Sequence, residues 1–214
     1  MKYVFPNMVY EQKAVEFIRE FYDHSSDING TGGLDDCLKS GTYADWLVKV
    51  IRDLDIANMP EGRVPAYTYF YVREEDDAII GMINIRLALN DFLRREGGHI
   101  GYCVRPKERS KGYCTAMVRG ALDFLRQVGL NEIIITCDKD NPASAAVIKK
   151  CGGALECEFY SETFETIVQR YIIRNDLEKL MDEADNEADA SDIRYKHGEI
   201  FKELKDGAYG KQNN

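Results

Sequence analysis

The sequence predicts a mixed α/β fold, in which a central twisted β-sheet carries helices on both faces and a C-terminal helical extension follows. Two observations predict it: apolar residues at helical spacing alternate with short β-branched and aromatic runs, and their order is helices, then strands, then strand–helix–strand–helix–strand. A third excludes a Rossmann or P-loop fold, because neither G-x-G-x-x-G nor G-x-x-x-x-G-K-[ST] occurs.

The first quarter of the chain predicts helices. Residues 8–22 and 43–57 both carry apolar residues at helical spacing. Residues 23–34 lie between them and are rich in turn-forming residues, so we expect a loop there. Two prolines and a glycine within residues 58–65 end the second helix.

The pattern then changes to strands. Residues 66–73 and 78–87 flank the charged turn 74–77 and predict a hairpin. Residues 98–104 predict a third strand, with Gly101 inside it. A glycine within a strand marks a bulge or a close approach by another group.

The clearest helix covers residues 113–128 and ends at Gly129. The apolar run 132–137 is short enough for a central strand. Asn141 and Pro142 predict the N-cap and first residue of another helix, which stops at Gly152–Gly153. Residues 154–160 and 167–174 predict the last two strands.

These elements define a predicted domain of residues 1–174, and residues 175–214 differ from it in charge. The extension holds 11 acidic and 6 basic residues, a net charge of −5. We expect a short amphipathic helix after its acidic run. The sequence leaves open whether it packs on the domain, makes a subunit contact in a homodimer, or is loosely held.

Charge and cysteine usage narrow the function. The net charge of −9 argues against a nucleic-acid partner, which needs a basic face, and tilts the choice of small partners toward cations. No apolar run approaches the roughly 20 residues of a membrane span, and the N-terminus lacks a signal-peptide core, so we expect a cytoplasmic protein without a membrane partner. The six cysteines form no C-x-x-C pair, so we expect reduced thiols and no metal.

The stretch 99–115 is the most informative. A predicted strand turns there into the start of a strong helix, and free N–H groups at a helix N-terminus favour a phosphate. Gly112 allows close approach by the backbone, and four cations lie within seven residues: Arg105, Lys107, Arg109 and Lys111. The alternative is a solvated basic turn that only begins a helix.

Two motifs in this region resemble those of the GNAT superfamily of acetyl-CoA-dependent N-acetyltransferases. The first is Val104-Arg105-Pro106 followed by Arg109, Gly112 and Cys114, where Cys114 stands in place of the usual glycine or alanine. The second is a strand leading to Asn141, Ser144 and Val147, with Gly152 at the end of the helix. The resemblance covers roughly 78–160 well, and implies the GNAT fold; it does not extend to 175–214.

The resemblance implies an N-acetyltransferase that moves an acetyl group from acetyl-CoA directly to the primary amine of a small molecule or peptide. The backbone of Tyr102, Cys103 and Val104 would pair with the pantetheine arm, and one of its N–H groups would polarise the thioester carbonyl. Asn141 and Ser144 would lie near the thioester, although helix capping also explains Asn141 fully. The pyrophosphate would be cradled by Arg109, Ser110, Lys111, Gly112, Tyr113, Cys114 and Thr115.

Catalytic groups are harder to identify. The family's usual acid is a tyrosine at the position of Ile148, which cannot donate a proton, so Tyr113, Tyr160 and Tyr171 remain candidates. His99 is the candidate base, because it begins the 98–104 strand and histidine titrates near neutral pH, and Glu96 is a weaker candidate. The missing tyrosine keeps open a non-catalytic acyl-CoA-binding regulatory module, and the extension keeps open a subunit of a larger acylating assembly.

The acceptor site is expected in residues 23–65 and 87–98, the least family-like parts. Aromatic residues that could line it, or could equally be core, are Trp46, Tyr43, Tyr67 and Tyr69. Acidic residues that could attract a cation, or could simply be solvated, are Asp35, Asp36 and Asp53.

Overall fold

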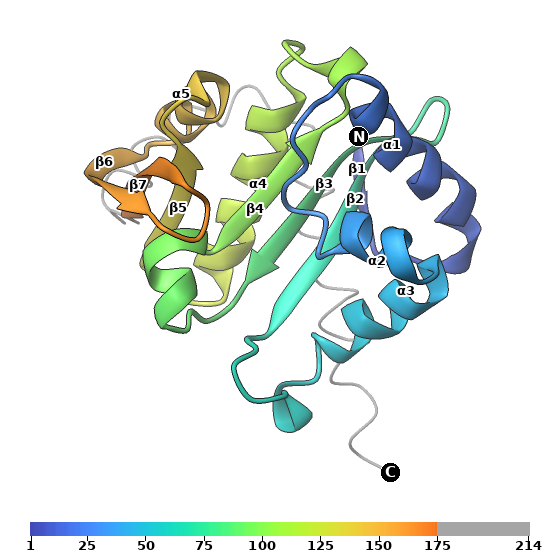
Figure 1. Cartoon of the computed structure of the whole chain (residues 1–214), viewed down its shortest axis with the longest axis horizontal. Helices are drawn as coiled ribbons and strands as arrows, with labels where there is room; N and C mark the ends of the chain where they lie inside the picture. Colours follow the sequence, from blue (N-terminus) through green and yellow to red (C-terminus); the bar gives the residue numbers. More distant parts are fainter. Residues whose placement is uncertain (175–214) are drawn as a thin grey trace.

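The computed structural model describes residues 1–174, so the predicted extension lies outside the described residues. Its strands form two sheets (Figure 1). The first has the order β1 (Lys2–Val4), β2 (Ala66–Arg73), β3 (Ala78–Arg86) and β4 (Ile100–Val104), and the second has the order β5 (Glu132–Asp138), β7 (Thr166–Arg174) and β6 (Ala154–Ser161). The mixed α/β fold is confirmed, with the difference that two sheets replace one and every paired strand among the described residues is antiparallel.

The two sheets join at the start of β4. The His99 N–H donates to the Ile134 carbonyl at 2.7 Å, and the Ile134 N–H donates back to the His99 ring Nδ1 at 2.9 Å. Beyond this junction the described residues show no backbone hydrogen bond between β4 and β5. The two strands therefore part, and the opening between them lies open to a ligand.

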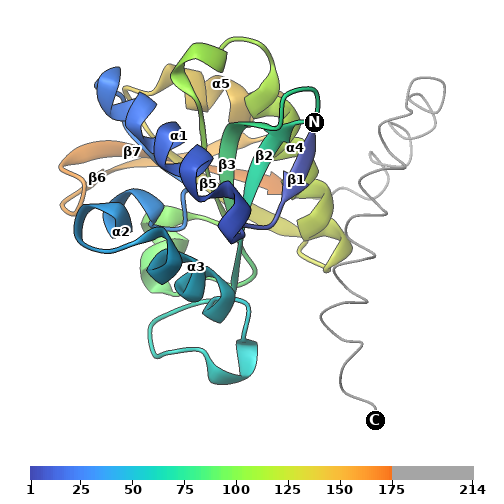
Figure 2. The same cartoon turned by 90° about the vertical axis from the view of Figure 1, so that its right-hand side faces the viewer.

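The helices cover both faces of the first sheet. Figures 1 and 2 show α1 (Glu11–Asp23), α2 (Leu34–Ser40) and α3 (Tyr43–Arg52) on one face and α4 (Tyr113–Gln127) on the other, while α5 (Pro142–Lys150) lies beside α4 and packs on β5 of the second sheet. Each face has its own buried apolar cluster. None of the described helices is long and apolar enough to cross a membrane.

Local chemistry explains the helix boundaries. The Thr42 hydroxyl and the Asp45 carboxylate form a reciprocal capping box at the start of α3. The predicted helix 8–22 begins as a 3-10 turn at Met8–Tyr10, and the predicted helix 43–57 ends early, with a separate 3-10 turn at Ile56–Asn58.

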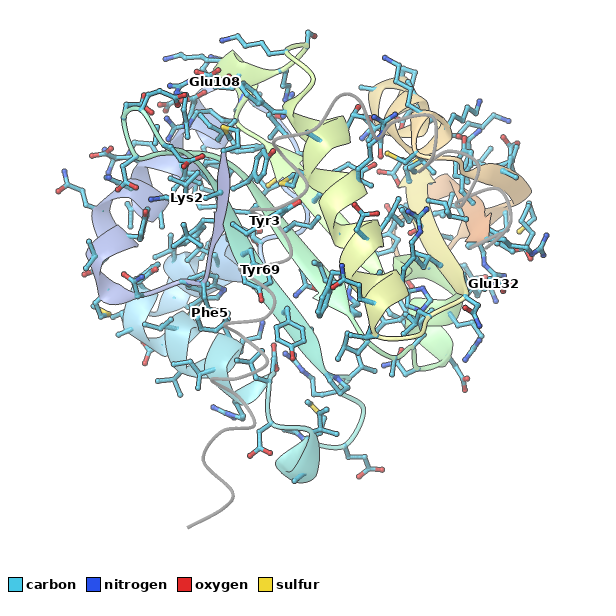
Figure 3. All side chains as sticks on the ribbon, turned by 180° about the vertical axis from the view of Figure 1, so that it is seen from behind. Lys2, Tyr3, Phe5, Tyr69, Glu108 and Glu132 are labelled. Carbon is cyan, nitrogen blue, oxygen red and sulfur yellow. The ribbon has the colours of Figure 1, made fainter. Side chains whose placement is uncertain are left out.

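Four short elements lie where no element was predicted: β1, α2, a π-helical turn at Leu93–Gly97 and a 3-10 turn at Pro106–Glu108. Each is too short to show a period in the sequence, and tertiary contacts hold it. In β1 the Tyr3 hydroxyl donates to the Met117 carbonyl of α4 at 2.6 Å. Figure 3 shows Tyr3, Phe5 and Tyr69 together beside α4, with ring centroids of Tyr3 and Tyr69 6.0 Å apart.

Candidate active site

A pocket of about 820 Å³ is lined by both diverging strands and by the first residues of α4 and α5. It collects almost all of the residues that the sequence predicts for the cofactor: Tyr102, Cys103, Val104, Arg109, Ser110, Gly112, Tyr113, Cys114, Thr115, Asn141 and Ser144. Lys111 is not part of the lining. Residues more than 40 positions apart in the sequence thus meet in one opening.

The N-terminus of α4 offers free hydrogen-bond donors to this pocket. Within the described chain, the backbone N–H groups of Gly112, Tyr113, Cys114 and Thr115 have no partner, and no side chain caps the helix. Gly112 adopts φ +84°, and no atom lies within 4 Å of where its Cβ would be. The start of this 15-residue helix is therefore an uncovered site for an anion.

The predicted cluster of four cations is largely neutralised. Arg105 Nε lies 3.4 Å from the Glu20 carboxylate, and Lys111 Nζ lies 2.8 Å from Glu108. Lys107 is exposed and does not line the pocket. Only Arg109 contributes a cation from this cluster, and its guanidinium donates to the Val104 carbonyl at 3.2 Å and to the Ser26 hydroxyl at 2.7 Å.

The edge of β4 that faces away from β3 is also free. The His99 carbonyl accepts the Arg86 N–H, and the Arg105 N–H donates to the Ile80 carbonyl, so the odd-numbered residues Gly101, Cys103 and Arg105 direct their backbone hydrogen bonds to β3. Alternation in an antiparallel ladder then turns the N–H groups of Tyr102 and Val104 toward the opening. An extended ligand can add to this edge as a further strand.

A side-chain pair spans the opening. The Tyr102 hydroxyl lies 2.8 Å from the Ser144 hydroxyl, which reaches it from α5. Burial raises the pKa of Tyr102 far above its ordinary value of 10, so this hydroxyl keeps its proton. Sequence reasoning assigned only the backbone of Tyr102 to the site and missed its hydroxyl.

The predicted cap at Asn141 is confirmed, since its side-chain oxygen accepts the Ser144 N–H at 3.0 Å. Ile148, at the position of the family tyrosine, is fully buried in the core beneath α4 and α5. Tyr171 is also buried and donates to Gln169 at 2.8 Å, and Tyr160 is exposed on β6 outside the pocket. Tyr113 does line the pocket, but at the start of α4.

His99 lies outside the pocket lining, contrary to what a base would require. Its side chain is buried, and its Nδ1 is occupied by the Ile134 N–H. Burial lowers the pKa of His99 from 6.5 to about 4. The geometry assigns His99 to the junction of the two sheets and gives no support to a role in proton transfer.

This burial makes a prediction for stability. Between pH 6.5 and about 4, His99 is protonated in the unfolded chain and neutral in the folded chain. The free energy of unfolding therefore decreases as the pH falls through this window. We expect His99 to account for about 2 kcal/mol of lost unfolding free energy between pH 7.5 and pH 5. In urea unfolding at both pH values, the decrease in unfolding free energy should be smaller by this amount for His99→Gln than for the unaltered protein. A loss as large as that of the unaltered protein would contradict the assignment, and His24→Gln, at an exposed histidine, is the control.

Glu96 is the carboxylate at the β4-start end of the pocket. Its side chain is 9% exposed, and one of its oxygens accepts the Ser161 hydroxyl at 2.6 Å. The remaining acids of the lining are Asp27, Glu108, Asp138 and Asp140, which come from the segments that precede α4 and α5 and from the loop after α1. Glu96 is therefore separated from the anion-binding end by the length of β4.

Of the two interpretations that the sequence left open for the four aromatic residues, the structure supports the core. Trp46, Tyr43 and Tyr69 are almost completely buried, Tyr67 packs against the core, and none of the four lines either of the two cavities described for residues 1–174. A second cavity of about 390 Å³ is instead lined by the glycine-rich loop 28–33 and by Asp35, Asp36 and Asp53, together with Lys49, Arg63 and Arg86. The sequence analysis missed Arg86, although one signal was visible: Arg86 is the single charged residue of strand β3 and lies at its end.

Comparisons with known proteins agree with this geometry. The sequence model of the acetyltransferase (GNAT) domain family matches residues 39–154, which is more than half of the chain. No curated protein matches the sequence.

Solved structures show the same fold at low sequence identity. A ribosomal-protein-S5-alanine acetyltransferase from Vibrio fischeri has a TM-score of 0.61 at 16% identity, covering 81% of this chain and 92% of its own. The microcin C7 self-immunity acetyltransferase MccE, in complex with acetyl-CoA and AMP, has a TM-score of 0.58 at 16% identity, covering 81% and 91%. A chimera of the spermidine N-acetyltransferase SpeG from Vibrio cholerae and hSSAT has 0.54 at 15% identity, covering 81% and 96%.

Proposed function

The chain belongs to the GNAT acetyltransferase family, and from that premise we propose that it transfers the acetyl group of acetyl-CoA to the primary amine of a small molecule or peptide. The observation that carries the proposal is the row of unpartnered N–H groups at the start of α4, which opens into the same pocket as the free edge of β4. Amides at the helix start suit a pyrophosphate, and a free strand edge suits a pantetheine arm. Residues 1–174 form the enzyme domain in this proposal, and 175–214 its extension.

Acetyl-CoA supplies the activated acyl thioester, and the chain's own residues supply the rest. Glu96 takes the proton of the acceptor amine, because it is the pocket carboxylate at the end of β4 opposite the helix start. A free N–H of Tyr102 or Val104 donates to the oxygen that gains negative charge. The Tyr102 hydroxyl, hydrogen-bonded to Ser144, donates a hydrogen bond to the leaving thiolate, which takes its proton from water.

The first test is a thermal-shift titration with acetyl-CoA, using ATP and NAD as controls. A ligand that binds only the folded state adds about 2.7 kcal/mol of stability at 100 times its dissociation constant. We expect a rise with acetyl-CoA alone, followed by thiol release when amines are added. No rise would overturn the proposal, whereas a rise with no thiol release from any amine would favour a binding module without turnover.

Gly112→Ala is expected to weaken acetyl-CoA binding about tenfold, because a methyl group would project into the amide cradle and the φ of +84° disfavours a side chain. The matched control is Gly129→Ala, at the other end of α4, where φ is +86° and the space is equally open. We expect both variants to lose similar stability. A difference between their acetyl-CoA affinities, measured by calorimetry, therefore reports the contribution of the amide cradle alone. Equal affinities in the two variants would place the phosphates elsewhere.

A further inference from the structure

Arg86 is a cation with a partly unused guanidinium at the point where the two cavities meet. It is the last residue of β3 and lines both cavities. Its Nη1 donates to the carbonyls of Gly97 and Gly98 at 2.7 and 2.9 Å. Within the part of the chain that the structure describes, it makes no ion pair, and its other nitrogens have no hydrogen-bond partner.

The acids around the second cavity are already engaged. Asp53 accepts two hydrogen bonds of 2.9 Å from Arg63, Asp36 pairs with Lys39 at 2.8 Å, and Asp35 accepts the Thr31 hydroxyl. None of them lies within ion-pair distance of Arg86. Burial lowers the pKa of Arg86 from 12.5 to about 10, so the group stays charged at neutral pH without a protein carboxylate to compensate it.

Lys49 adds a second cation to the same cavity. Its ammonium donates to the Gly32 carbonyl, and no carboxylate lies within ion-pair distance among the described residues. The lining of this cavity holds three cations, Lys49, Arg63 and Arg86, and three acids, so its charges balance although the chain as a whole is acidic. The overall charge of the chain, which favoured a cationic acceptor, therefore gives no preference for a cation in this cavity.

Glu96 lines the same pocket as Arg86, with its carboxylate 2.6 Å from the Ser161 hydroxyl and 3.7 Å from Arg95. The two residues share the pocket lining, and Arg86 is anchored to the carbonyl of Gly97, the residue next to Glu96. No ion pair joins them. One anion and one cation, close in space and not paired with each other, complement a ligand that carries both charges.

We propose that the acceptor is a free amino acid or a similar amine that carries a carboxylate, with the carboxylate bound by Arg86 and the amine directed to Glu96. This inference rests on the proposed acetyl transfer and names the substrate class of that site. A polyamine fits it poorly, because a second ammonium group at the carboxylate position would meet the Arg86 guanidinium.

The test compares acceptors that differ only in the carboxylate. Thiol release from acetyl-CoA is measured for the full chain with L-alanine and ethylamine, L-tyrosine and tyramine, and L-lysine and cadaverine, with spermidine as a polyamine. A charged hydrogen bond of about 1.5–3 kcal/mol corresponds to a roughly 10- to 100-fold preference in kcat/KM for the amino acid of the best pair. Arg86→Gln is expected to abolish that preference by raising KM for the amino acid alone. The matched control is Arg94→Gln, which removes an exposed charge from the turn Leu93–Gly97 that follows β3.

Each outcome decides one point. Amines without a carboxylate that react as well as amino acids overturn the inference and leave the acetyl transfer intact. A preference that survives in Arg86→Gln overturns the assignment to Arg86. A chain that is stabilised by acetyl-CoA and acetylates no acceptor overturns the proposed function, and this inference with it. Should Arg86→Gln not fold, the ratios of the unaltered protein still decide the substrate class.

Discussion

Replacing Glu96 with glutamine is expected to lower kcat by about 10²- to 10⁴-fold, the usual contribution of a positioned general base. Glutamine keeps the size of the side chain and an oxygen that can accept the Ser161 hydroxyl, now bonded at 2.6 Å. The amide cannot take a proton from the acceptor amine. The affinity for acetyl-CoA is expected to stay unchanged, because the amide cradle lies at the other end of β4.

The measurement is kcat by thiol release, with the thermal shift by acetyl-CoA as the check on folding and cosubstrate binding. Glu162→Gln is the matched control, because Glu162 is exposed and lies next to Ser161 outside the pocket lining. A kcat within threefold of the unaltered protein would transfer the role of base to another group or to a water relay. A parallel loss of acetyl-CoA binding would show that Glu96 shapes the pocket instead.

The phosphate-binding half of the site could be predicted from the sequence because its determinants are local. The helix at 113–128 has a strong period, and Asn141 with Pro142 gives a capping signal within two residues. The structure ends α4 at Gln127 and caps α5 at Asn141. A helix start and its glycine are set by neighbouring residues, so a short window of sequence suffices.

The acceptor half could not be predicted, because its geometry depends on distant contacts. In the sequence His99 has the features of a base, but in the structure the N–H of Ile134, 35 residues away, donates to its ring nitrogen. Glu96 gains its position from a π-helical turn and from Ser161, 65 residues away. The prediction of a basic cluster at 105–111 was wrong for the same reason, because Glu20 on α1, distant in the sequence, neutralises Arg105.

Gly98→Ala is expected to lower the free energy of unfolding by about 3 kcal/mol or more. Gly98 adopts φ +62° and ψ −173°, a backbone conformation that is essentially confined to glycine. A Cβ there would lie 2.6 Å from the Ile134 carbonyl oxygen, which is closer than packed atoms allow. That oxygen accepts the His99 N–H, so the methyl group would displace the bond that joins the two sheets.

Gly62→Ala separates this clash from simple backbone strain. Gly62 has φ +76°, and no atom lies within 4 Å of its Cβ position, so we expect a loss of about 1 kcal/mol there. Urea unfolding of both variants measures the difference directly. Equal losses would mean that the junction yields easily and does not fix the angle between β4 and β5. A much larger loss for Gly98→Ala, with a further drop in kcat at temperatures where the variant is folded, would show that this junction holds the opening in which Glu96 and the free edge of β4 meet.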